Sequence, residues 1–323
     1  MSLSFGLVVF FTTIIYIKKI SFDLIYKLII LWFIIGILQI SPLRDYINSV
    51  LEIIMTRSFS SDLDISRGIQ LLANEPSFAG IYLTLFLVLF DFFLMKKYLT
   101  LKKIWILRLV AGVLILATKS ANSILLLLSY VFIKIISDKK GFKYILVFFL
   151  IILPIVYLVT VNNDFDSRGL NLFKLLLTNP VLLLNDHSLS SRFYLIYISY
   201  FGFFDNYLLP NGVGSYSFNW MVLAQQLELL DVYEINKSMG NYLMPMSFLG
   251  GIAHDYGIFG IILVMVLIFY PLYKNKSNEY KQYIFTSGFF IFFLWLQTCS
   301  YALPLPWFIL AINYTLLKNT NRF

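Results

Sequence analysis

The chain has 323 residues, of which 59% are hydrophobic and 13% charged, with a formal net charge of +8 and a mean hydropathy of +0.81. Soluble domains carry about 25% charged residues, so the composition indicates an integral membrane protein and excludes an ordinary soluble enzyme. A single cysteine, Cys299, and two histidines, His187 and His254, exclude an intrachain disulfide and argue against a metal centre built from these residues. We expect no metal and no cofactor.

Apolar segments recur along the whole chain, and a spanning helix needs about 20 mostly apolar residues. We predict an all-α, polytopic bundle of about nine transmembrane helices that forms a single domain, residues 1–323. The predicted spans are 3–17, 24–41, 77–95, 104–118, 120–137, 143–161, 250–273, 282–299 and 302–317. The first apolar run lacks a signal-type cleavage site and is predicted to be a retained span.

Lysine clusters fall at alternate ends of the predicted spans, and basic residues mark cytoplasmic ends. The clusters begin at Lys18, Lys96, Lys139, Lys274 and Lys318. The two long polar segments, about 42–76 and 162–249, are therefore predicted to face the outside. This alternation also puts the N-terminus outside, unless one helix is miscounted or the natural chain begins further upstream.

Arginines follow a different pattern, because five of the seven lie on the two outer segments. These five are Arg44, Arg57, Arg67, Arg168 and Arg192. The planar guanidinium group donates pairs of hydrogen bonds that suit phosphate oxygens. A pyrophosphate at the membrane surface is the ligand that fits them best; the alternative is pairing with nearby acids such as Asp62 and Asp164.

The first outer segment ends in SRGIQLLANEPSFAG, residues 66–80, directly before the third predicted span. Pro76 is expected in the first turn of that helix, where proline is well tolerated. Glu75 should then lie at the membrane interface together with Arg67. We predict Glu75 to be the general base for a membrane-delivered substrate; the alternatives are a helix cap and a structural salt bridge.

The second outer segment contains an aromatic helix, with Ser190 or Ser191 predicted as its N-cap and Arg192 in its first turn. A turn is predicted at 210–214, and the acidic, amphipathic stretch 221–237 follows it. Tyrosines of this segment, among them Tyr216, are expected either to stack on sugar rings or to form interface belts.

His254 precedes the seventh span at the sequence HDYGIFG and is the second candidate base. The alternative is a structural histidine, which is the commoner role in an apolar setting.

Four stretches carry a resemblance to a known family. They are RG-x7-EPSFAG at 67–80, SSRF followed by LPNGVGSY within 190–216, DYGIFG at 255–260 and QTCSYALPLPWF at 297–308. In this order, with a large outer loop between late spans, the chain resembles the O-antigen and capsular polysaccharide polymerases of the O-antigen polymerase/ligase superfamily. The resemblance covers most of the chain from about residue 60 onward.

The resemblance implies a C-type glycosyltransferase-like fold and an inverting, metal-independent glycosyltransferase in the bacterial inner membrane, with its active face periplasmic. The donor would be a growing glycan on undecaprenyl pyrophosphate, and the acceptor one lipid-linked repeat unit. The family's outer-loop arginines map onto Arg67 and Arg192, and Arg168 is a further candidate for the pyrophosphate. A membrane-bound chain-length regulator is an expected partner, and nucleic acid is not.

Two other functions remain open, an O-antigen ligase and a lipid-linked oligosaccharide flippase or transporter. The ligase branch uses a histidine in the outer loop, and residues 241–247 here contain none. A transporter more often has charges in the centres of its spans. Here Asp91 and Arg108 are nearly the only such charges, and both lie toward predicted cytoplasmic ends.

Overall fold

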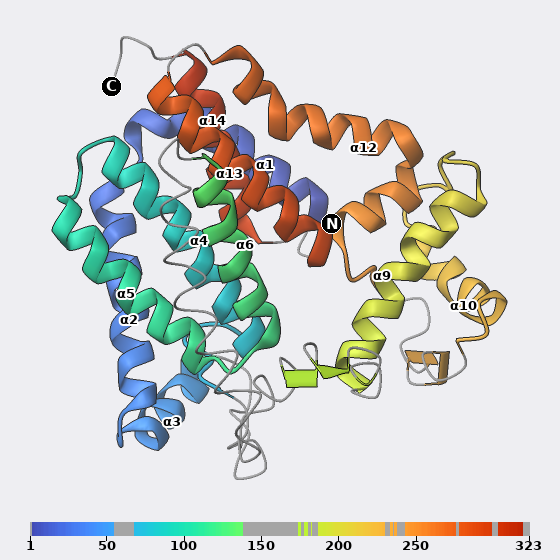
Figure 1. Ribbon diagram of the computed structural model, residues 1–323, viewed down its shortest axis with the longest axis horizontal. Coiled ribbons are helices and arrows are strands. Elements are labelled where there is room, and N and C mark those ends of the chain that lie inside the picture. The colour runs from blue at the N-terminus through green and yellow to red at the C-terminus, as the bar shows by residue number, and fades with distance from the viewer. Residues whose placement is uncertain are drawn as a thin grey trace. The chain divides into compact units, whose positions relative to one another are not determined.

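The computed structural model describes residues 2–54, 68–137, 174–175, 178–179, 182, 187–229, 233–234, 236–237, 243–275, 278–298 and 303–318. This described part is helical and contains no strand (Figure 1). Its main helices are α1 (Ser2–Tyr16), α2 (Phe22–Ile40), α3 (Arg44–Ile54), α4 (Pro76–Met95), α5 (Leu101–Ala117), α6 (Ala121–Ser137), α9 (His187–Asp205), α10 (Tyr216–Gln226), α12 (Phe248–Lys274), α13 (Asn278–Gln297) and α14 (Pro304–Lys318). The prediction of an all-α protein is confirmed for these residues.

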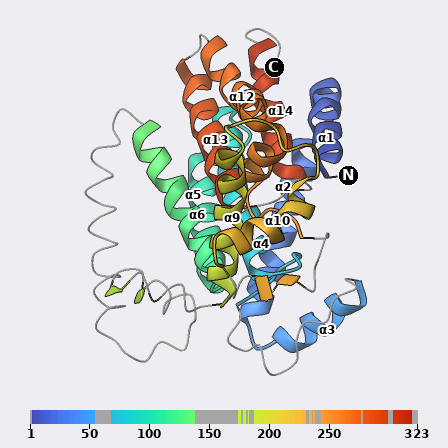
Figure 2. The same cartoon turned by 90° about the vertical axis from the view of Figure 1, so that its right-hand side faces the viewer.

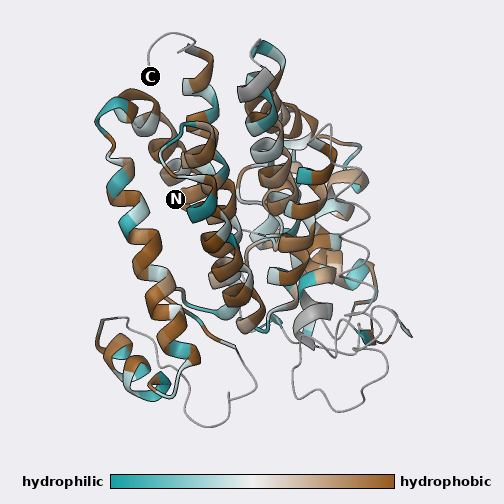
Figure 3. Ribbon diagram, turned by 60° about the vertical axis from the view of Figure 1, so that its left-hand side comes forward, coloured by the Kyte–Doolittle hydropathy of each residue, from teal (hydrophilic) through white to brown (hydrophobic). Residues whose placement is uncertain are grey.

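Each predicted span except 143–161, which lies outside the described residues, coincides with a helix. Among the described residues, three helices are both long and apolar enough to cross a bilayer: α2 with 19 residues, α4 with 20 and α12 with 27. The helices α6 and α14 are apolar but shorter. Figure 3 shows apolar residues along most of the helices and hydrophilic residues gathered near helix ends and turns.

The exposed face of α2 is what a lipid-facing helix requires. Leu24, Leu28 and Leu31 are about half exposed and recur with helical spacing. Soluble monomers rarely expose continuous apolar stripes of this kind. Together with the three long apolar helices, this stripe identifies an integral membrane protein.

The chain divides into two compact units, each of which is described by itself. Unit 1 comprises residues 1–14, 179–276 and 288–323, and unit 2 comprises 15–178 and 277–287. In unit 2, α4, α5 and α6 pack side by side (Figure 2). The helix α4 is the most buried of the three long apolar helices. It approaches α6 closely at Gly80, where an added Cβ would lie 1.7 Å from the Oγ of Ser123.

Unit 2 also brings charged side chains of these three helices together around the buried carboxylate of Asp91. The carboxylate of Asp91 on α4 accepts a hydrogen bond from Arg108 on α5. Its other oxygen lies 3.1 Å from Nζ of Lys134 and accepts a 2.9 Å hydrogen bond from the hydroxyl of Tyr130, both on α6. A charge within an apolar helix is costly unless it is paired. Here Asp91 is paired, and the pairing joins three helices.

In unit 1, α9 and α10 pack on each other and on the first part of α12 (Figure 1). A buried cluster joins them, formed by Leu195, Ile198, Tyr216, Trp220, Leu223, Ala224 and Leu243. Phe248, the first residue of α12, packs on the rings of Trp295 and Trp307. Its N–H also donates to the carbonyl of Thr298, so the residues of QTCSYALPLPWF that the structure describes reach the start of α12.

Two local predictions differ from the structure. The helix α9 begins at His187, so Ser190 and Ser191 lie inside it and neither is its N-cap. The first outer segment was predicted as polar chain, but its residues 44–54 form the strongly amphipathic helix α3. Its polar face hid the helix from a search for long apolar runs.

Candidate functional site

The segment that leads to Glu75 is fixed by backbone contacts within unit 2. The N–H of Ile69 donates to the carbonyl of Ala117, and the N–H of Leu71 donates to the Gln39 side chain at 2.8 Å. At Gly68 an added Cβ would lie 2.1 Å from the backbone of Thr118. Only glycine permits this approach, so the stretch after Arg67 is held against the end of α5.

Glu75 occupies the N-cap position of α4, and Pro76 is the first helical residue, as predicted. Its carboxylate makes no capping hydrogen bond to the helix backbone. It accepts a 3.4 Å hydrogen bond from the hydroxyl of Ser77 instead. The alternative that Glu75 is a helix N-cap is therefore confirmed for its position, although its side chain makes no capping bond, and its role as a base or in a salt bridge stays a prediction.

The three arginines predicted to hold pyrophosphate are only partly described. Arg67 and Arg168 lie outside the described residues. Arg192 lies in the second turn of α9, not in its first turn as predicted, and is exposed. Its role at a phosphate remains a prediction.

The second candidate site is built around a break in α12 within unit 1. Gly257 has φ 63° and ψ −154°, a conformation that essentially only glycine adopts, and it divides α12 into two helical parts. An added Cβ would lie 2.6 Å from the carbonyl oxygen of Leu208. Past the break, the N–H of Ile258 donates to that same carbonyl. The loop after α9 therefore docks into the break, next to His254 and Asp255.

The first part of α12 is anchored at its N-cap, Ser247. The Ser247 hydroxyl accepts from the N–H of Gly250 at 2.9 Å and donates to the carbonyl of Trp295. It also lies 3.5 Å from the hydroxyl of Tyr200 on α9. Burial raises the pKa of Tyr200, and this contact opposes the rise only in part, so the phenol stays neutral.

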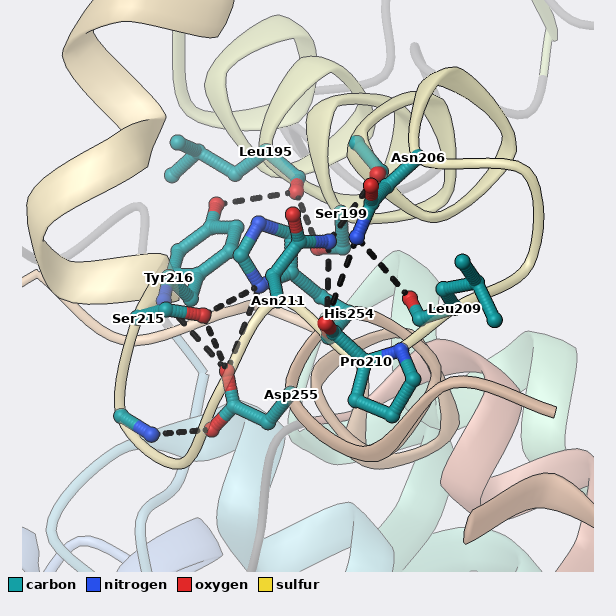
Figure 4. Close-up of polar contacts among 12 residues, drawn as sticks. Leu195, Ser199, Asn206, Leu209, Pro210, Asn211, Ser215, Tyr216, His254 and Asp255 are labelled. Atoms are coloured by element: carbon teal, nitrogen blue, oxygen red, sulfur yellow. Dashed lines mark hydrogen bonds and ion pairs between the residues drawn. The ribbon is translucent and has the colours of Figure 1, made fainter. Parts of the chain in front are cut away.

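Asp255 binds the loop that follows α9 (Figure 4). One carboxylate oxygen, Oδ2, accepts from the N–H of Gly214 at 2.8 Å. The other, Oδ1, accepts from the N–H of Tyr216 at 3.3 Å and from the hydroxyl of Ser215 at 3.4 Å. The predicted turn at 210–214 is confirmed in part: the N–H of Ser215 donates to the carbonyl of Gly212, so the turn lies at 212–215, and Asp255 holds its end.

The imidazole of His254 is held from one side by the same groups. Its Nδ1 lies 3.2 Å from Oδ1 of Asp255 and 3.3 Å from Oγ of Ser215 (Figure 4). A carboxylate beside Nδ1 favours the tautomer in which Nδ1 carries the proton and donates a hydrogen bond to the carboxylate. Nε2 then has a free lone pair, and it has no hydrogen-bond partner among the described residues.

The backbone carbonyl of His254 is held as well, and its ring is closely approached by α9. Its carbonyl accepts from the N–H of Asn211 at 3.1 Å and from the side-chain amide of Asn211 at 3.2 Å. Across the ring, an added Cβ on Gly202 of α9 would lie 2.8 Å from Cδ2 and 3.1 Å from Nε2 of His254. Glycine at this point lets α9 approach the face that carries the free nitrogen.

A cavity of about 190 Å³ lies beside this ring, and His254 is part of its lining. Gly202 and the apolar side chains of Val222 and Leu223 form part of the wall. The described residues contain no cluster of three or more histidine, cysteine or acidic residues that could hold a metal ion. An imidazole oriented at Nδ1 and free at Nε2, next to a pocket, is the arrangement of a general base.

Tyr216, predicted to stack on a sugar or to belong to an interface belt, does neither. It is buried, donates its hydroxyl to the carbonyl of Leu195 and meets the His254 ring edge to face. The residues that sequence reasoning missed are Asn211, Ser215 and Asp255, which orient His254. Their signal was present in two of the four quoted stretches, LPNGVGSY and DYGIFG, which the fold brings together.

Comparisons with protein-family models, with curated proteins and with solved structures found no match to this chain.

Proposed function

We propose that the chain polymerises lipid-linked oligosaccharide repeat units into O-antigen or capsular polysaccharide. The observation that carries the proposal is His254, buried beside a cavity with Nδ1 against Asp255 and Nε2 unpartnered among the described residues. A sugar hydroxyl becomes a competent nucleophile when such a base accepts its proton. The stretches that resemble the polymerase family contribute the residues around this base.

The reaction is a single displacement with inversion. The acceptor hydroxyl oxygen forms a bond to the anomeric carbon of the donor glycan while its proton passes to the base. The bond between that carbon and the pyrophosphate oxygen breaks, and its electron pair leaves with undecaprenyl pyrophosphate. Arg67, Arg168 and Arg192 neutralise the developing charge on the leaving group, which guanidinium donors do without a metal ion.

Two residues compete for the role of base, Glu75 and His254. The sequence alone favours Glu75. The geometry favours His254, because Nδ1 of its imidazole is held by the carboxylate of Asp255. The Glu75 carboxylate, in contrast, contacts the hydroxyl of Ser77. We propose His254 as the base and keep Glu75 as its rival.

The proposed setting is the bacterial inner membrane, with nine spans, a C-type glycosyltransferase-like fold and both outer segments on the periplasmic face. Donor and acceptor then arrive from the bilayer, each carried on its lipid. A chain-length regulator in the same membrane is the proposed protein partner.

The ligase and the flippase are the rival functions. The described residues give a transporter little support, because Asp91 and Arg108 inside the helices pair with each other rather than lining a path. For the ligase, the separation of His254 from the loop at 241–247 remains the argument against it.

Deletion of the gene in its source organism, followed by glycan length profiling, tests the proposal. Loss of the polymer ladder with single capped units retained is the expected result. Loss of all capped units would instead identify a ligase or a flippase, and an unchanged ladder would exclude all three.

A further inference from the structure

The cavity beside His254 contains several polar side chains whose hydrogen-bonding groups are unused. Asp205 on α9 and Asn219 and Gln226 on α10 line it. Asp205 and Gln226 are exposed and Asn219 is half-buried, and within the described part of the chain these three side chains make no hydrogen bond or ion pair. Asn211 also lines the cavity, and its amide N–H groups are engaged by the carbonyls of Gly202 and His254, which leaves its side-chain oxygen available.

The charge of the cavity is as informative as its polarity. Among the described residues that line it, none is lysine or arginine, and Asp205 is the one charged residue. The carboxylate of Asp255 lies directly behind His254. Like charges in a partly enclosed site repel each other, so phosphate and carboxylate groups are disfavoured. The cavity is therefore not a pyrophosphate site.

Amide and carboxylate groups combined with a small apolar wall suit a different ligand. Val222 and Leu223 offer a surface for the C–H face of a sugar ring, while amides bind its hydroxyls from the edge. We propose that this cavity is the acceptor subsite and that it selects an uncharged sugar over hexuronic acids and sugar phosphates. The acceptor role depends on the proposed polymerase function, but the selectivity for uncharged sugars does not.

The subsite assigns separate tasks to its residues. Asn219 and Gln226 bind ring hydroxyls, so removing one of them weakens binding without changing which sugars bind. Asp205 sets the selectivity, because its charge repels an anionic sugar. His254 receives the proton of the hydroxyl that the other residues have oriented.

The test uses the full-length protein in detergent and follows the only remaining imidazole. His187 lies outside the subsite, so His187→Gln leaves His254 as the single histidine, and ring-labelled histidine gives one side-chain NMR signal. Methyl glucoside, glucuronate and glucose 1-phosphate are titrated in turn. We expect methyl glucoside to shift the His254 signal and to bind at least about ten-fold more tightly than either anion.

Variants of the lining separate binding from general structure. Asn219→Ala and Gln226→Ala should each weaken methyl glucoside binding by about 3- to 10-fold, the range for one lost hydrogen bond. Asp205→Asn should raise the affinity for glucuronate. The matched control is Gln225→Ala, which changes an exposed side chain next to the equally exposed Gln226 but outside the lining, and it should leave binding unchanged.

Two results would overturn the inference: no shift of the His254 signal with any saccharide in a folded protein, or equal affinities of the wild type for glucuronate and methyl glucoside. Failure of the polymerase function is distinguishable from either. An unchanged polymer ladder after gene deletion combined with selective glucoside binding would remove the function and leave the sugar site. A lost ladder without glucoside binding would support the polymerase function and remove the sugar site.

Discussion

Asp255 holds the imidazole of its chain neighbour His254, with Oδ1 3.2 Å from Nδ1, while its second oxygen accepts the N–H of Gly214 at 2.8 Å. A single carboxylate therefore orients the candidate base and fixes the loop beside it. The orientation of the base and the shape of the cavity wall consequently depend on each other.

Asp255→Asn should impair both. The amide nitrogen that replaces one oxygen cannot accept a hydrogen bond from an N–H. Either the N–H of Gly214 loses its acceptor, or the N–H of Tyr216 and Nδ1 of His254 lose theirs. We expect a loss of about 1–3 kcal/mol in the free energy of unfolding and a fall in polymerisation. Thermal unfolding in detergent measures the first effect, and chain-length profiles measure the second.

The control for that variant is Asp23→Asn, which removes an exposed i,i+4 pair with Lys27 on α2. Exposed pairs contribute little, so stability and polymer length should stay close to wild type. Equal effects of the two substitutions would refute the linking role of Asp255.

Gly257→Ala should be strongly destabilising. Its φ of 63° and ψ of −154° are strained for alanine, and the new Cβ would lie 2.6 Å from the carbonyl oxygen of Leu208. The backbone strain alone costs about 1–3 kcal/mol. The expected result is a lower unfolding temperature together with loss of the His254 signal shift on adding methyl glucoside.

Gly112→Ala is the comparison for that change. Gly112 lies inside α5, and no other part of the described chain comes within 4 Å of an added Cβ, so alanine should be neutral or stabilising by about 0.5–1 kcal/mol. If both alanine variants unfold at the same temperature, the break in α12 does not depend on glycine.

Local signals predicted local structure well. Pro76 begins α4 as expected, because a first-turn proline costs no hydrogen bond and needs no distant partner. The start of α9 at His187 was missed because serines are good N-caps in isolation, and here packing of the aromatic helix extends it further. The long apolar helices could be located from the length of their apolar runs, whereas the short amphipathic helix α3 could not.

The site was harder to predict for a different physical reason. His254 was identified as a candidate, but besides its neighbour Asp255 it is held by Ser215 at the ring and by Asn211 at the backbone, both about 40 residues earlier in the chain. No periodicity reports such contacts. The pairing of Asp91 with Arg108 could have been predicted from the sequence, because two opposite charges inside predicted spans need partners.

Lysine should not replace Arg67 or Arg192 if they bind pyrophosphate through paired hydrogen bonds. A point charge cannot reproduce the planar pair of donors. We expect Arg67→Lys and Arg192→Lys to lower polymerisation by about 10- to 100-fold at normal expression, with a milder loss for Arg44→Lys. Near wild-type chain lengths in both lysine variants would argue against a phosphate role.

The predicted orientation of the outer segments can be tested with single cysteines in a Cys299→Ser background. Cysteines at Ser61 and Ser188 should react with a membrane-impermeant thiol reagent once the outer membrane is permeabilised. A cysteine at Ser277 should stay protected until the inner membrane is opened. The reverse labelling pattern would move the active face to the cytoplasm.

The two candidate bases are separated by a pair of glutamine substitutions assayed with purified enzyme and lipid-linked repeat units. Glutamine keeps hydrogen-bonding capacity at either position but does not accept a proton at neutral pH. Because Nε2 of His254 is unpartnered among the described residues and Nδ1 is held by Asp255, we expect His254→Gln to lower the rate by about 10²–10⁴-fold. Glu75→Gln should cost much less if that carboxylate serves only to hold the start of α4, where it accepts a hydrogen bond from Ser77. An inactive Glu75→Gln enzyme beside a nearly wild-type His254→Gln enzyme would assign the base to Glu75 and leave His254 as a structural residue.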